Sequence, residues 1–215
     1  MPTPPLKVLA FNCSLKGARD EDKSSTDVLL KQVLEAFGER GAKGEIVRAV
    51  DHNIKPGVSS DEGRGDAWPK LRKRVVDADI LVIGTPVWLG QPSSVAKRVL
   101  ERMDAFLGET DDRGRMPSYG KVAIAVVVGN EDGAHHCAAE ITAALAEVGF
   151  TIPSGGATYW VGEAMGDKVY KDLLRTPKMV DQVESDAGLQ RGASGASAQE
   201  RELSGYRGRP LVPPI

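Results

Sequence analysis

Short runs of apolar residues alternate along this chain with segments whose apolar residues recur every three or four positions. The runs are rich in Val, Ile and Leu and are bounded by polar or glycine-containing stretches. Such runs are typical of parallel strands buried on both faces, and the segments between them are typical of crossover helices. The runs predict strands at residues 7–12, 45–50, 78–84 and 122–128, with a last strand between Phe150 and Tyr159.

The amphipathic segments predict the helices that join these strands. The first runs from Thr26 to near Arg40, and Gly41 is its expected C-terminal stop. Further helices are expected around Leu71 and at residues 93–106 and 134–148, while residues 84–90, GTPVWLG, are expected to end the third strand abruptly. Strands that alternate with helices in this way predict an α/β fold built on a doubly wound parallel sheet.

Length and composition indicate one domain followed by a polar extension. The 215 residues, with 41% hydrophobic content, suffice for one buried core of ordinary size, which we expect within residues 1–180. Beyond Asp181 the chain is rich in Ala, Gly and Ser and poor in the apolar residues needed for packing. Residues 181–215 are therefore expected to form a C-terminal arm or a disordered tail.

Charge and cysteine content limit the classes of partner and compartment. Charges of both signs are mixed along the chain and sum to a formal net charge of -2, which favours small-molecule partners over nucleic acid or an anionic membrane. Cys13 and Cys137 fit no secreted disulfide framework, and the sequence shows neither a signal peptide nor an apolar run that could span a bilayer. We expect a cytoplasmic protein.

Three polar or glycine-rich loops directly follow predicted strands, at residues 12–26, 85–90 and 129–133. The carboxyl ends of parallel strands meet at one edge of a sheet, and doubly wound sheets bind their ligands there. We therefore expect the three loops to converge on one site. Together they have the chemistry of a flavin mononucleotide (FMN) site, with a phosphate cradle, an aromatic and apolar wall, and backbone amides.

The first loop has the composition of a phosphate site. Ser24, Ser25 and Thr26 stand at the start of the first helix, where unpaired backbone N–H groups carry partial positive charge. Ser14 and Lys16 add a hydroxyl group and a full charge. Such a site holds phosphate without a metal, and no metal site is expected. The alternative for Ser24 to Thr26 is a simple helix cap.

The loops and the segments around them resemble the flavodoxin-like NAD(P)H-dependent FMN reductases, a family that also includes quinone reductases and iron-sulfur flavoproteins. The matching pieces are NCSLK with KSSTDVLL, TPVWLGQPSSVAKRVLERM, and VAIAVVVGNEDG, within residues 7–153. The resemblance implies a flavodoxin-like five-stranded parallel sheet in the order 2-1-3-4-5 with helices on both faces. It also implies that Ser14, Lys16, Ser24, Ser25 and Thr26 hold the phosphate, that Pro86, Val87, Trp88, Leu89 and Gly90 flank the isoalloxazine ring, and that Gly129, Asn130, Glu131, Asp132 and Gly133 form the loop at its pyrimidine edge.

By this resemblance the protein is an FMN-dependent oxidoreductase that transfers hydride from NADH or NADPH, through bound FMN, to an acceptor such as a quinone or free flavin. The cofactor carries that chemistry, so no catalytic side chain is predicted. His135 and His136 follow the third loop, but we interpret them as a solvent-facing pair at a helix N-terminus. The resemblance also implies a homo-dimer or homo-tetramer.

Two other functions are weighed against this one. Cys13 and Arg19 have the C-x5-R spacing of low-molecular-weight tyrosine phosphatases, but the acidic residues after Arg19 would repel a phosphate dianion. A non-enzymatic flavodoxin-type electron carrier is the closer alternative; such carriers are usually strongly acidic, whereas this chain is nearly neutral. The iron-sulfur members carry a cysteine cluster after the second strand, and residues 53–68 contain no cysteine, so no cluster is expected here.

Overall fold

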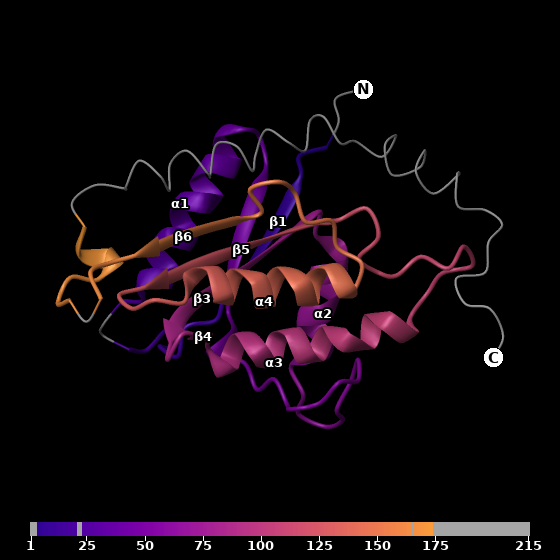
Figure 1. Cartoon of the computed structure of the whole chain (residues 1–215). Coiled ribbons are helices and arrows are strands. Elements are labelled where there is room, and N and C mark those ends of the chain that lie inside the picture. The colour runs from indigo at the N-terminus through magenta and orange to yellow at the C-terminus, as the bar shows by residue number, and fades with distance from the viewer. Residues whose placement is uncertain (1–3, 21–22, 165, 174–215) are drawn as a thin grey trace, which may run out of the picture.

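The computed structural model describes residues 4–20, 23–164 and 166–173. Within them the chain forms one parallel sheet covered by helices on both faces (Figure 1). The arm or tail predicted for residues 181–215, and the domain boundary predicted at residue 180, lie outside the described residues.

The sheet has the predicted flavodoxin-like order. Its parallel strands are β1 (Lys7–Asn12), β2 (Lys43–Arg48), β3 (Ile80–Trp88), β5 (Val122–Gly129) and β6 (Ala157–Val161), arranged as β2-β1-β3-β5-β6. Numbered among themselves in chain order, these five strands read 2-1-3-4-5, which confirms the prediction. The short β4 (Gln91–Pro92) was not expected and pairs antiparallel with the end of β3.

The helices divide between the two faces because each strand alternates its side chains. Val8 and Ala10 of β1 pack under α1 (Ser25–Glu39), whereas Leu9 and Phe11 face the layer of α2 (Trp68–Asp77), α3 (Ser94–Met103) and α4 (Ala134–Glu147). Three short 3-10 helices complete the described elements: η1 (Ala49–Asp51), η2 (Asp104–Gly108) and η3 (Tyr170–Asp172). Of these, η3 packs on the α1 face.

The third strand differs most from its prediction. It does not end at Gly84 but continues to Trp88, because residues 84–86 pair with residues 126–128 of β5 and the last residues pair with β4. The predicted break occurs instead at Leu89 and Gly90, whose φ angles of 53° and 74° turn the chain. Smaller shifts place the second strand at residues 43–48, the last strand at 157–161, and the end of α3 at Met103.

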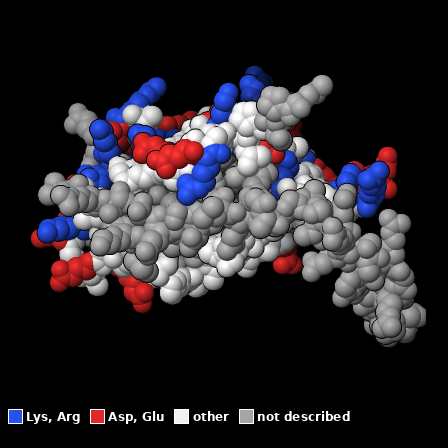
Figure 2. All heavy atoms as spheres, turned by 90° about the horizontal axis from the view of Figure 1, so that it is seen from above, with Lys and Arg blue, Asp and Glu red and all other residues white. Residues whose placement is uncertain are grey.

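The surface charges are mixed, as their order along the sequence suggested. On the face shown in Figure 2, described Lys and Arg side chains stand among described Asp and Glu side chains. The described part of this face therefore shows no continuous basic region of the kind that a nucleic acid would bind.

Candidate functional site

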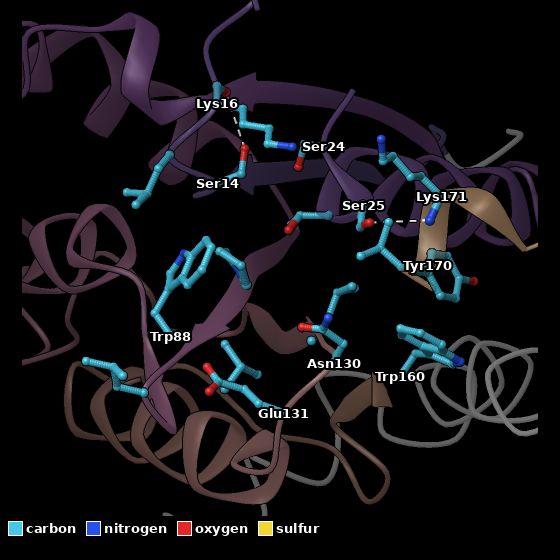
Figure 3. A pocket seen from close by; sticks show the side chains of 18 residues that line it. Ser14, Lys16, Ser24, Ser25, Trp88, Asn130, Glu131, Trp160, Tyr170 and Lys171 are labelled. Atoms are coloured by element: carbon cyan, nitrogen blue, oxygen red, sulfur yellow. Dashed lines mark hydrogen bonds between the residues drawn. The ribbon is translucent and has the colours of Figure 1, made fainter. Parts of the chain in front are cut away.

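A cavity of about 580 Å³ lies at the carboxyl ends of the strands, where the three predicted loops meet (Figure 3). Its volume falls in the usual range for cofactor pockets. Twelve of the fifteen predicted site residues line it: Ser14, Lys16, Ser24, Ser25, Thr26, Pro86, Val87, Trp88, Leu89, Gly129, Asn130 and Glu131. The convergence predicted from the sequence is therefore present.

One end of the cavity is the N-terminus of α1. Ser24 caps this helix, since its hydroxyl accepts a hydrogen bond of 3.3 Å from the backbone N–H of Asp27. Ser24 also lines the cavity, as do Ser25 and Thr26 in the first helical turn. Ser24 can therefore cap the helix and face the cavity at the same time. This end of the cavity carries hydroxyl groups beside the backbone N–H groups of a helix N-terminus, the chemistry that binds phosphate.

Arg48, at the end of β2, holds the first loop in place and was not predicted. Its guanidinium donates to the Asp27 carboxylate at 2.8 Å and to the carbonyl of Lys16 at 3.2 Å. The same Asp27 oxygen accepts from the side-chain amide of Asn12, whose own oxygen accepts from the N–H of Ser14. Burial works to raise the pKa of Asp27, but the hydrogen bond from Lys31 and the charge of Arg48 outweigh it and lower that pKa. Arg48 therefore links the loop to the first turn of α1.

Replacing Arg48 by alanine is expected to weaken FMN binding about 10-fold, because the loop that carries Ser14 and Lys16 loses its anchor while Asp27 keeps its negative charge near the phosphate end. Flavin fluorescence quenching during titration measures the change. Arg40→Ala is the matched control, since Arg40 is exposed at the other end of α1, does not line the cavity, and donates to the carbonyl of Ala36. Unchanged affinity in Arg48→Ala would contradict the anchoring role.

The middle of the cavity is aromatic and apolar. Pro86, Val87 and Trp88 come from the end of β3, and Trp160 comes from β6 on the other side (Figure 3). Trp88 is 54% exposed, so it does not fill a gap in the core. Its ring is available to a planar ligand.

The third loop is only partly exposed to the cavity. Asp132, Gly133 and Gly90 do not line it, contrary to the prediction. Gly133 has a φ of 126°, and a Cβ atom placed there would lie 2.6 Å from the Cα of Gly90. The two glycines thus allow the backbones of the second and third loops to pack together behind the cavity, and the Asp132 carboxylate accepts from the N–H of Gly133.

Six lining residues were missed by the sequence analysis: Leu15, Val128, Trp160, Val169, Tyr170 and Lys171. The first two neighbour predicted residues. The last three belong to or adjoin η3, which follows a polar stretch with no apolar periodicity. Among the missed residues, only the aromatic side chains of Trp160 and Tyr170 gave a sequence signal for a ligand site.

The structure argues against the phosphatase alternative. Cys13 is fully buried among apolar side chains, and this burial strongly raises the pKa of its thiol, whereas a nucleophilic cysteine needs a lowered pKa.

His135 and His136 are exposed and lie outside the lining of the cavity. Their rings are hydrogen-bonded to Tyr159 and Gln91 respectively. In the part of the chain that the structure describes, no cluster of three or more His, Cys, Asp or Glu residues could hold a metal.

Comparison with known sequences agrees with this geometry. Residues 6–165 match the family described as NADPH-dependent FMN reductase. The chain belongs to this family. Membership of this family and the flavoprotein relatives support FMN as the cofactor.

The chain matches only part of the length of two curated relatives. The chain is 34% identical over 168 residues to the 8-demethyl-8-aminoriboflavin-5'-phosphate synthase of Streptomyces davaonensis, matching 74% of this chain and 65% of the relative. It is 39% identical over 171 residues to the divalent metal cation transporter MntH of Mycobacterium bovis, but that match spans 78% of this chain and only 25% of the transporter. None of the described helices is both long and apolar enough to cross a membrane.

Two solved structures share the fold of this chain. RosB with bound 8-demethyl-8-formylriboflavin-5'-phosphate superposes with a TM-score of 0.75 at 28% identity, covering 98% of this chain and 92% of RosB. The NADH:FMN oxidoreductase EmoB superposes with a TM-score of 0.60 at 17% identity, covering 89% and 91%, which shows the shared fold.

Proposed function

We propose that the protein is an FMN-dependent oxidoreductase that takes hydride from NAD(P)H onto bound FMN and delivers the reducing equivalents to a small-molecule acceptor such as a quinone or free flavin. The observation that carries the proposal is the combination of chemistry around one cavity. A hydroxyl-rich helix N-terminus lies on one side, Trp88 and Trp160 flank the cavity with Asn130 between them, and Glu131 lies on the side away from that N-terminus (Figure 3). A phosphate, a planar ring system and a polar ring edge need these three environments.

The chain's residues would bind and orient the cofactor. Ser14, Lys16 and the hydroxyl groups of residues 24–26 would hold the phosphate, and Trp88 with its neighbours would flank the ring system. Backbone N–H groups of the third loop would stabilise negative charge at the pyrimidine edge. FMN supplies the redox chemistry when bound, so no side chain needs to act as an acid or a base.

The experiment is to purify the protein, measure flavin absorption after adding FMN, and follow oxidation of NADH and of NADPH with menadione or free flavin as acceptor. We expect stoichiometric FMN and turnover that depends on the acceptor. Bound FMN without turnover would favour the electron carrier instead, and failure to bind FMN would overturn the proposal.

A second candidate function treats a flavin 5'-phosphate as the substrate. It is favoured by the 34% identity to a protein named as a synthase of a modified riboflavin phosphate, and by the likeness to RosB, which holds a riboflavin 5'-phosphate derivative. Mass spectrometry of the flavin recovered after incubation of FMN with the protein distinguishes the two functions. A cofactor is recovered with its mass unchanged, whereas a substrate is converted to a product of different mass.

We also propose a cytoplasmic homo-dimer or homo-tetramer. Leu15, Trp88 and Leu89 are 50%, 54% and 91% exposed around the cavity, and together they form an apolar rim that a second subunit could cover. Light scattering of the purified protein tests the oligomeric state, and a monomer at micromolar concentration would contradict it.

A further inference from the structure

The segment of residues 169–171, which lies beyond the family match at residues 6–165, forms part of the cavity wall. Tyr170 is 2% exposed, and its hydroxyl donates to the side-chain oxygen of Gln32 on α1. Its ring also meets Trp160 edge-on, with ring centres 5.4 Å apart. Tyr170 therefore fastens the segment to the helix and to the last strand.

These contacts set Lys171 beside the phosphate end of the cavity. Its backbone N–H donates at 3.3 Å to the hydroxyl of Ser25, the first residue of α1. In Figure 3 Lys171 lies next to Ser25, on the same side as Ser24 and Lys16. Because the Ser25 oxygen accepts this bond, its hydroxyl hydrogen can be donated to a ligand.

The charged side chains in the described lining are separated along the cavity. Lys16 and Lys171 lie at the end formed by α1, and Glu131 lies toward the opposite end with the third loop (Figure 3). Lys16 and Lys171 are far apart in the sequence, one after β1 and the other after β6. A dianionic group is thus favoured at the α1 end and disfavoured at the Glu131 end.

We propose that Lys171 is a second cation for the 5'-phosphate, held in place by Tyr170, and that this segment makes the cavity select phosphorylated flavins over riboflavin. The inference rests on the proposed binding of FMN in this cavity. A phosphate monoester carries nearly two negative charges near pH 7, so Lys16 and the helix N-terminus leave charge for a second lysine to balance. Riboflavin has the same ring and ribityl chain but no such charge, and its affinity should not depend on Lys171.

The test compares FMN and riboflavin binding by the full-length protein and by Lys171→Gln, using fluorescence quenching at low and moderate salt. We expect Lys171→Gln to bind FMN about 10-fold more weakly and riboflavin within about twofold of the unaltered protein. The FMN affinity of the variant should also fall less steeply with salt. Lys171→Arg, which keeps the charge, should retain FMN affinity within about threefold.

Lys168→Gln is the matched control, because Lys168 is exposed and does not line the cavity. Circular dichroism melts confirm that each variant is folded. Equal losses for FMN and riboflavin, or an unchanged FMN affinity in Lys171→Gln, would overturn the inference while leaving the proposed function intact. If the unaltered protein binds no FMN, the proposed function itself fails.

Discussion

Replacing Arg102 by alanine is expected to lower the free energy of unfolding by about 3–5 kcal/mol, because a buried carboxylate loses its charge partner. Arg102 lies on α3 with a fully buried side chain, and its guanidinium donates to Asp66 at 2.7 Å. A second nitrogen donates to the carbonyl of Lys55 at 3.1 Å. The pair thus attaches the long loop between η1 and α2 to α3. Urea denaturation measures the loss.

A control variant and the pH dependence of stability decide whether the ion pair between Arg102 and Asp66 is responsible for this loss. Lys97→Ala, on the same helix but 57% exposed in its pairing with Glu140, should change the unfolding free energy by less than about 0.5 kcal/mol. A loss below about 1 kcal/mol in Arg102→Ala would contradict the stabilising role of the pair.

The pH dependence gives the second readout. Burial acts to raise the pKa of Asp66, but backbone N–H groups of Glu62, Trp68 and Lys55 and the charge of Arg102 outweigh it and lower that pKa. A carboxyl whose pKa is lower in the folded state stabilises the fold above its unfolded pKa, about 4, and loses this contribution as the pH falls through its folded pKa. The unaltered protein should therefore lose more stability on acidification below about pH 5 than Asp66→Asn does.

The fold could be predicted because its central strands β1, β3 and β5 are buried on both faces. The run at residues 7–12 is apolar almost throughout, and its predicted bounds match β1. The third strand was predicted too short, since residues 84–88 contain Gly, Thr and Pro and are held extended by pairing with β5 and β4. The pairing with β5 joins segments about 40 residues apart, and local sequence patterns do not report it.

In the candidate site, too, residues marked by local sequence signals were predicted, whereas residues placed by contacts with distant parts of the chain were missed or misassigned. Ser24 and its neighbours were predicted because a cap, a helix start and hydroxyl groups are local signals. Gly90 was assigned to the flank of the ring and Gly133 to the loop at its pyrimidine edge, yet the structure packs these two glycines closely against each other. Tyr170 was missed because its partner Gln32 lies 138 positions earlier in the chain.

Ser25→Asp is expected to weaken FMN binding at least about 100-fold while leaving the protein at least as stable as before. Ser25 is the first residue of α1 and lines the cavity, so an aspartate there brings a carboxylate close to a bound phosphate. Two unit charges about 4 Å apart repel by roughly 4 kcal/mol at an effective dielectric constant of ~20, and about 2.7 kcal/mol already corresponds to 100-fold. The same carboxylate interacts favourably with the helix N-terminus by about 0.3–1 kcal/mol, so the melting temperature should not fall. Titrations with FMN and melting curves measure both effects.

Riboflavin and Ser25→Asn separate charge repulsion from a change of shape. Asparagine has nearly the size of aspartate but no charge, so Ser25→Asn should keep FMN affinity within about 10-fold, and Ser25→Asp should bind riboflavin within about threefold of the unaltered protein. If Ser25→Asp lost both flavins equally, the substitution would have distorted the cavity rather than repelled a phosphate. If it lost neither, the phosphate would have to lie elsewhere, and the role assigned to the N-terminus of α1 would be wrong. An aspartate at residue 25 should stabilise the helix and weaken FMN binding, because the N–H groups that interact with the new carboxylate are the same ones that would bind the phosphate. Measuring both effects at this position therefore tests the phosphate site directly.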